Sequence, residues 1–199
     1  MKKQIKHKAK GRVLFQGKYI RLVKKRNWEY IERHNCSGIV IIVSMTAAGK
    51  VVLTEQFRPP VGKRVIEFPA GLMGDQAKFK KETVSNAAQR ELLEETGYLS
   101  NDIMLLTKGP VSGGSSADLV NMVIARGLKK VGPGGGDASE RIKVHEVTLG
   151  KMEGWLARKE RQGCLIEPKI YSGLYFLNKY NDVLNPVKPI RNKKGAVRT

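Results

Sequence analysis

Short apolar runs and stretches in which apolar and polar residues alternate cover most of the chain, and both patterns predict β-strands. Residues 11–34, rich in β-branched and aromatic side chains, predict two strands that turn near 24–27. The continuous apolar run at 37–46 predicts a buried strand. The other strands are expected at 51–58, 65–71, 103–112, 119–126 and 141–149.

Few segments are expected to be helical. The helices are predicted at 82–96, 150–161 and 167–180. Gly97 follows the first of them, in the position where glycine most often ends a helix. Small residues at 112–118 and the glycine-rich stretch 132–140 predict loops. Many strands, few helices and no internal repeat indicate an α+β fold rather than a regular alternation of strand and helix.

The composition is that of a soluble globular protein, with 41% hydrophobic and 28% charged residues in a chain of 199. This length suits one domain with a small appendage. No apolar run approaches the roughly 20 residues that a membrane span needs, and no apolar signal segment follows the basic N-terminus. The only cysteines, Cys36 and Cys164, lie far apart and lack metal-ligand spacing. We therefore expect a cytoplasmic protein with reduced thiols and no membrane contact.

The formal net charge of +19 is concentrated at the two ends of the chain. Residues 1–35 contain 12 Lys and Arg against 2 acids, and residues 151–199 contain 11 against 4, whereas residues 36–150 contain 14 against 12. Basic ends favour polyanions, namely nucleic acid, acidic lipid or a phosphorylated small molecule. The alternative is that they are solvated termini, and the charge alone does not decide between the two.

One stripe of the helix expected at 82–96 changes from apolar to acidic along its length. It consists of Val84, Ala87, Ala88, Glu91, Glu94 and Glu95. Carboxylates near a helix C-terminus are unfavourable, because the helix dipole already places negative charge there and like charges repel across one turn. A bound cation offsets this cost, and hard divalent ions prefer oxygen ligands. The alternative is a solvated acidic face paired with Arg90 and nearby lysines.

Residues before, within and after this helix stand at characteristic spacings. They are Gly71, Glu82, Arg90, Glu91, Leu92, Glu94, Glu95, Gly97 and Tyr98. This set resembles the Nudix box, whose pattern is glycine, five residues, Glu, seven residues, then Arg-Glu-apolar-x-Glu-Glu-x-Gly-apolar. The second half matches fully, but Gly71 lies eleven positions before Glu82 instead of six, because LMGDQAKFKK carries about five extra residues. The insertion lengthens the loop before the helix and leaves the helix intact.

Segments outside the box resemble the ADP-ribose pyrophosphatase and nucleoside diphosphate sugar hydrolase branch of the Nudix family. They are GKYIRLV, WEYIERHNCSG, VVLTEQFRPPV, EFPAGLMGD and IEPKIYSGLYFL. The segment VSGGSSAD departs from the branch pattern Ser-Pro-Gly-x-Ser-x-Glu, since Gly113 replaces the proline and Asp118 the Glu. This departure favours a broader nucleotide-sugar specificity over strict ADP-ribose specificity.

The resemblance implies an α+β fold, an α/β/α sandwich with a mixed central sheet, plus an N-terminal antiparallel β-sheet region used for dimerisation. Residues 1–40 would form this region, with strands exchanged in a homodimer, residues 41–185 the hydrolase domain and residues 186–199 a basic tail. The implied reaction cleaves the pyrophosphate bond of a nucleoside diphosphate sugar, such as ADP-ribose or GDP-mannose, to a nucleoside monophosphate and a sugar phosphate.

The resemblance also assigns roles to residues. Mg²⁺, with Mn²⁺ as the alternative ion, would be held by Glu91, Glu94, Glu95 and the backbone carbonyl of Ala70. The residues expected to hold the box together are Gly71, Glu82, Arg90 and Gly97. For the general base we select Glu140, in the glycine-rich stretch whose other acid is Asp137. The alternatives are a box carboxylate such as Glu94, and Asp118.

Substrate-binding candidates lie outside the box. Arg58, at the end of a predicted strand, is a candidate phosphate clamp because guanidinium pairs well with phosphate. Its alternative role is a surface ion pair, and Arg90 is a second candidate to reach phosphate. The candidates for contact with the rest of the nucleotide are Trp28, Tyr19, Arg33 and Asp118. For the aromatic residues the alternative is packing between strands.

Two other functions remain open. The basic ends favour a pyrophosphohydrolase acting on RNA 5′ ends, against which stand the segments that resemble the nucleotide-sugar branch. The other is a nucleotide- or RNA-binding module without catalysis, whose signature would be a lost box carboxylate, whereas Glu91, Glu94 and Glu95 are all present. Nucleic acid is therefore a secondary partner beside a nucleotide-sugar substrate.

Overall fold

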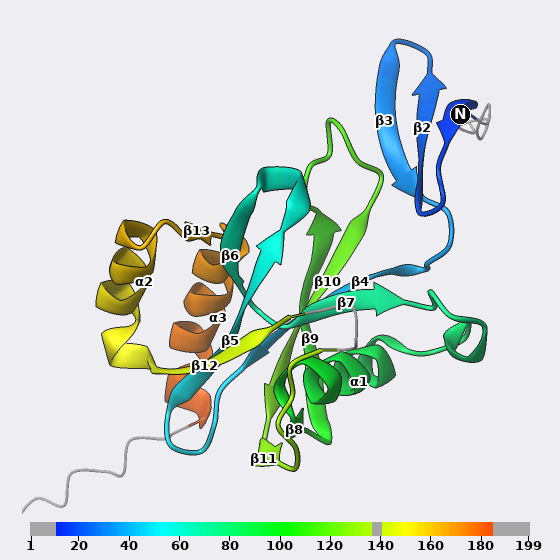
Figure 1. Ribbon diagram of the computed structural model, residues 1–199. Helices are drawn as coiled ribbons and strands as arrows, with labels where there is room; N and C mark the ends of the chain where they lie inside the picture. The colour runs from blue at the N-terminus through cyan, green and yellow to red at the C-terminus, as the bar shows by residue number, and fades with distance from the viewer. Residues whose placement is uncertain (1–10, 137–140, 185–199) are drawn as a thin grey trace, which may run out of the picture.

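Two four-stranded sheets form the centre of the molecule (Figure 1). The computed structural model describes residues 11–136 and 141–184. The first sheet has the strand order β7 (Ala70–Met73), β4 (Gly38–Ser44), β10 (Leu119–Arg126) and β9 (Asp102–Pro110). The second has the order β12 (Lys143–Thr148), β5 (Lys50–Arg58), β6 (Lys63–Glu67) and β13 (Leu165–Ile166). Each contains one parallel pair, β4 with β10 and β6 with β13, so both sheets are mixed as expected.

Helices cover both faces of these sheets. Helix α1 (Val84–Thr96) lies on one face, and α2 (Met152–Arg161) and α3 (Lys169–Leu184) lie on the other (Figure 1). Side chains of β4 point alternately to the two faces. Val40 and Ile42 pack with α1, and Ile41 packs with α2 and α3. The predicted α/β/α sandwich is therefore confirmed.

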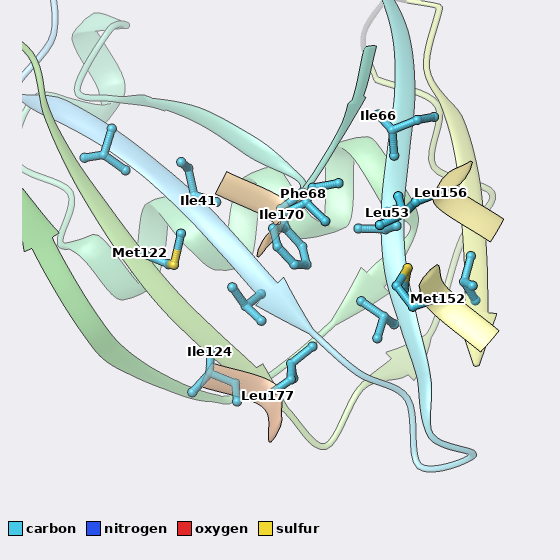
Figure 2. Packing of buried hydrophobic residues seen from close by; sticks show 14 of the residues in the cluster. Ile41, Leu53, Ile66, Phe68, Met122, Ile124, Met152, Leu156, Ile170 and Leu177 are labelled. Atoms are coloured by element: carbon cyan, nitrogen blue, oxygen red, sulfur yellow. The ribbon is translucent and has the colours of Figure 1, made fainter. Parts of the chain in front are cut away.

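The larger part of the core lies between the sheets and the α2–α3 pair (Figure 2). Its fully buried members include Phe68, directly after β6, and Ile170 and Leu177 on α3. Burying each such side chain contributes about 1.5–3 kcal/mol relative to leaving it in water. Within the described residues, no helix is both long and apolar enough to cross a bilayer.

A separate three-stranded antiparallel sheet precedes the sandwich. It consists of β1 (Arg12–Gln16), β2 (Ile20–Lys25) and β3 (Trp28–Arg33), so the segment 11–34 forms three strands rather than the two predicted. The extra turn closes where the Gly17 amide donates to the Ile20 carbonyl over 2.9 Å. In Figure 1 this sheet stands beside the sandwich, and β3 contacts it where the Ile31 amide donates to the Ser115 carbonyl over 2.9 Å.

Other element boundaries also differ from the prediction. The expected strand at 65–71 is two strands in different sheets, β6 and β7, because the chain changes sheets at Phe68–Pro69. Helix α1 begins at Val84, after Thr83, whose side-chain oxygen accepts from the Asn86 amide and caps the helix. The short strands β8 (Tyr98–Leu99), β11 (Lys129–Lys130) and β13 were not predicted, nor were the 3₁₀ turns Pro59–Val61, Ala77–Phe79 and Leu149–Lys151.

Candidate functional site

The three carboxylates of α1 differ in their surroundings. Glu95 is buried, with 3% of its surface exposed, and its Oε2 accepts a hydrogen bond of 3.2 Å from the Ala70 amide on β7. The Glu91 side chain is 13% exposed and the Glu94 side chain 52%. Two acids therefore lie between α1 and β7, and the third faces solvent, so Glu94 lies outside the buried part of the predicted stripe.

Gly71 on β7 allows the strand to approach the helix acids closely. A Cβ atom at Gly71 would lie 1.9 Å from Cδ of Glu91, a distance that no side chain tolerates. The carboxylate of Glu91 thus occupies the space that any other residue at 71 would fill. Despite the insertion between Gly71 and Glu82, the glycine still meets the acidic end of the helix.

Arg90 connects the acids of the box. Its Nη2 donates to Oε1 of Glu82 over 3.1 Å and to the Leu72 carbonyl over 3.0 Å. Its Nη1 donates to Oε1 of Glu91 over 2.7 Å and to Oε2 of Glu94 over 3.3 Å. The guanidinium is therefore bonded to several of the protein's own acceptors.

Burial changes the acid–base properties of Glu91. Desolvation raises its pKa to about 7, and the charges of Glu94 and Asp75 act in the same direction, while Arg90 opposes the shift. Such a site favours an additional positive charge, because a cation stabilises the ionised carboxylate.

The donors suit a hard divalent cation. Within the part of the chain that the structure describes, the Glu91 Oε2 accepts no hydrogen bond, because Arg90 holds only Oε1. Carboxylate oxygens are the ligands that Mg²⁺ and Mn²⁺ prefer. In the same described residues no three acidic, histidine or cysteine side chains converge on one point. The acids of α1 that remain candidates to hold an ion are Glu91, Glu95 and the more exposed Glu94.

The glycine-rich stretch after β11 is fixed to the C-terminal end of α1. The Gly135 amide donates to the Glu95 carbonyl over 2.8 Å, and the Gly136 amide to the Glu94 carbonyl over 3.1 Å. These bonds satisfy carbonyls that a helix end leaves without partners. Gly97 ends the helix at φ 71°, in the left-handed conformation predicted for it. The predicted base Glu140 and its neighbour Asp137 lie outside the described residues.

Arg58 ends β5 on the face of the sheet where α1 lies, because the even-numbered residues of β5 follow Val52, which packs with α1. Its Nε donates to Oε2 of Glu67 over 2.9 Å, and Nε2 of Gln56 donates to the same oxygen over 3.3 Å. The Arg58 side chain is 41% exposed, whereas that of Glu67 is 9% exposed. Arg58 thus forms an ion pair and keeps part of its guanidinium open to solvent.

The remaining predicted residues lie on or near the N-terminal sheet. Arg33 at the end of β3 pairs with Asp118, with 3.4 Å between Nε and Oδ2. Trp28 is 61% exposed and Tyr19 54%. The sheet that carries these aromatic residues lies apart from α1 (Figure 1), so a single chain brings Arg33 and Asp118 together but does not place Trp28 and Tyr19 beside the acids.

Two residues near the site were missed by sequence reasoning. Glu67 is an acid within the otherwise apolar run VIEF, and this unusual position is the sequence signal that could have identified it. Phe79 lies in the insertion, and its ring centroid is 4.5 Å from Cζ of Arg90. Nothing in the local sequence pattern indicates that contact, which depends on the path of the loop.

The protein is an α/β/α sandwich whose acid-bearing helix lies against a glycine of β7. The NUDIX domain family matches residues 35–148, more than half of the chain, and the protein belongs to that family. The family match confirms the prediction made from the residues that resemble the Nudix box.

Relatives and a solved structure extend the comparison. A methanol dehydrogenase activator from Bacillus methanolicus is 33% identical over 130 residues, 65% of this chain and 66% of that protein. An ADP-ribose pyrophosphatase from Bacillus subtilis (strain 168) is 33% identical over 113 residues, 56% of this chain and 58% of that protein. A crystal structure of an ADP compounds hydrolase matches with a TM-score of 0.66 at 19% identity, over 89% of this chain and 95% of the other, which shows the shared fold. The chain spans just under two thirds of the first relative and less of the second.

Proposed function

We propose that this Nudix protein is a Mg²⁺-dependent hydrolase that cleaves the pyrophosphate bond of nucleoside diphosphate sugars. The products are a nucleoside monophosphate and a sugar phosphate. The observation that carries the proposal is the pair of acids on α1 that face β7: the half-buried Glu91 against Gly71, and the buried Glu95 bonded to the Ala70 amide. The similar proteins named as an ADP-ribose pyrophosphatase and an ADP compounds hydrolase support this substrate class.

The residues that hold the ion are Glu91, Glu94, Glu95 and the Ala70 carbonyl. When bound, Mg²⁺, or Mn²⁺ as the alternative, neutralises the pyrophosphate and orients the attacking water. Arg90 keeps Oε1 of Glu91 in place, so that Oε2 is available as a ligand. Glu82 in turn anchors Arg90 from the opposite edge of the guanidinium.

Glu140 is the proposed general base, with Glu94 as the alternative. The described residues on both sides of the segment 137–140 support this choice. Gly136 is bonded to the Glu94 carbonyl, and the Ile142 amide donates to the Gly135 carbonyl over 3.2 Å. The described residues that flank the segment 137–140 therefore lie at the acid-bearing end of α1. As general base, the Glu140 carboxylate would accept the proton of the attacking water.

Arg58 is the proposed phosphate clamp, oriented by Glu67. We expect Arg58→Lys to raise KM for the nucleotide sugar about tenfold and to leave kcat within about threefold, because an ammonium cannot reproduce the two-point contact of a guanidinium. Steady-state kinetics measures both constants. Arg64→Lys is the matched control, since Arg64 on β6 pairs with Glu55 instead. If the two variants had equal KM values, Arg58 would not contribute to substrate binding.

We also propose that residues 1–40 form a homodimer interface. Residues 41–185 would then be the hydrolase domain, and residues 186–199 a basic tail. In the N-terminal sheet Phe15 is 69% exposed, and of the residues in its three strands only Val23 is buried. A sheet with so little core needs a partner surface. In such a dimer, Trp28 and Tyr19 of one subunit can contact the nucleobase held by the other.

The dimer is checked by sedimentation equilibrium. We expect twice the chain mass of 22.2 kDa at micromolar concentration. A monomer throughout that range would contradict the proposed interface.

The proposed function is tested by turnover of a substrate panel with Mg²⁺. ADP-ribose, GDP-mannose and related nucleotide sugars are compared with capped and triphosphorylated RNA, and the products are resolved by chromatography. We expect cleavage of at least one nucleotide sugar to a nucleoside monophosphate and a sugar phosphate. Cleavage of RNA ends alone would instead show an RNA pyrophosphohydrolase. Salt-dependent RNA binding without any turnover would show a binding module.

A further inference from the structure

The segment that carries the insertion in the Nudix box forms a closed loop. This segment is residues 72–81, between Gly71 and Glu82, and about five of its residues are extra. The Gly74 amide donates to Oε1 of Glu82 over 2.8 Å, and the Glu82 amide donates to the Phe79 carbonyl over 2.9 Å. A 3₁₀ turn at Ala77–Phe79 completes the loop. Glu82 thus fixes both the start of the loop and its return.

This loop places the ring of Phe79 on the guanidinium of Arg90. The distance from Cζ of Arg90 to the ring centroid is 4.5 Å, within the range of a cation–π contact. The edges of the guanidinium are already bonded to Glu82, to the Leu72 carbonyl and to Glu91. The guanidinium lies over the ring of Phe79, and the Arg90 side chain keeps only 13% of its surface exposed.

Phe79 has no other evident structural task among the described residues. It belongs to neither of the two hydrophobic core clusters. Its second aromatic contact is with Lys78, whose Nζ lies 4.6 Å from the same ring. Lys78 is an exposed residue, so this contact is open to water and contributes less than the one to the largely buried Arg90.

We propose that Phe79 is a positioning residue for the metal-binding carboxylates, and that this is the role of the insertion. The ring holds the plane of Arg90, and Arg90 holds Oε1 of Glu91 at 2.7 Å. Without the ring the guanidinium gains freedom to rotate, and the carboxylate of Glu91 moves with it. The inference rests on the proposed function in one respect, namely that Glu91 ligates the ion.

The test uses Mn²⁺ alone, so that it needs no substrate. Phe79→Leu keeps an apolar side chain and removes the aromatic face, whereas Phe79→Tyr keeps both. Electron paramagnetic resonance of free Mn²⁺ gives the dissociation constant of each variant. We expect Phe79→Leu to weaken Mn²⁺ binding about fivefold and Phe79→Tyr to leave it within about twofold. Lys78→Ala is the control for the exposed contact and is expected to match the wild type.

A second readout reports the contact itself. Because Arg90 lies over the ring of Phe79, we expect the ring current to shift the NMR signal of the Arg90 Nε–H proton upfield. This shift is expected to persist in Phe79→Tyr and Lys78→Ala and to disappear in Phe79→Leu.

Unchanged Mn²⁺ affinity in Phe79→Leu would overturn the proposal, as would equal losses in the Leu and Tyr variants. Mn²⁺ binding that depends on Phe79 in a protein that cleaves no nucleotide sugar would support the positioning role and reject the proposed function. Turnover of nucleotide sugars, together with Mn²⁺ affinity that is independent of Phe79, would support the proposed function and reject the positioning role.

Discussion

Glu95→Gln is expected to lower kcat for a nucleotide sugar about a thousandfold. The amide preserves the size of the side chain, and its oxygen can still accept the hydrogen bond from the Ala70 amide. It removes the negative charge at the most buried acid of α1, which is 3% exposed. Metal assistance supplies several kcal/mol of transition-state stabilisation, and each 1.36 kcal/mol changes the rate about tenfold. Steady-state turnover with saturating Mg²⁺ measures the effect.

Glu160→Gln is the matched control, because Glu160 is an exposed acid on α2, on the opposite face of the sheets. It is expected to leave kcat unchanged. Glu140→Gln separates the proposed base from the proposed ligands: loss of a general base lowers kcat about 10²- to 10⁴-fold but should leave Mn²⁺ affinity unchanged. If Glu95→Gln turned over as fast as Glu160→Gln, Glu95 would not be a required ligand of the ion.

Gly71→Ala is expected to weaken Mg²⁺ activation about a hundredfold. The added methyl group would lie 1.9 Å from Cδ of Glu91, so the carboxylate must leave its position between β7 and α1. Displacement of one ligand group typically costs a metal site one to two orders of magnitude in affinity, about the effect of losing a supporting partner. The measurement is the Mg²⁺ concentration that gives half-maximal turnover, with circular dichroism to confirm that the variant is folded.

Gly109→Ala provides the comparison for this substitution. Gly109 also lies in a strand, β9, and a Cβ atom there would meet nothing within 4 Å. Neither glycine has a positive φ, so the two substitutions differ in steric contact rather than in backbone strain. We expect Gly109→Ala to need the same Mg²⁺ concentration as the wild type. An equal response in both variants would show that the close approach of Gly71 to Glu91 has no bearing on the metal site.

The α+β class and several single elements were predictable because they depend on local patterns, whereas the layers of the sandwich followed from the resemblance to the Nudix family. The apolar run at 37–46 indicated a buried strand, and β4 is buried, packing with α1 on one side and with α2 and α3 on the other. The end of α1 at Gly97 followed from the preference of glycine for the left-handed conformation. Such features require only the residues within a few positions of each other.

Features that depend on the path of the chain were not predictable in this way. The stretch 65–71 has the composition of one strand, yet Pro69 lies between two strands that belong to different sheets. The orientation of Glu94 toward solvent follows from the width of the buried stripe, which includes Glu95 but not its neighbour. The same limit applies to the contact of Phe79 with Arg90, since spacing along the chain does not show where an inserted loop returns.

The central claim is that α1 and β7 hold a divalent cation that is required for pyrophosphate cleavage. The most direct measurement is phosphorus NMR of ADP-ribose incubated with the protein, once with Mg²⁺ and once with EDTA. We predict that the two diphosphate signals are replaced by two phosphomonoester signals, of AMP and ribose 5-phosphate, only when Mg²⁺ is present. Persistence of the diphosphate with both Mg²⁺ and Mn²⁺, or equal cleavage in EDTA, would contradict it.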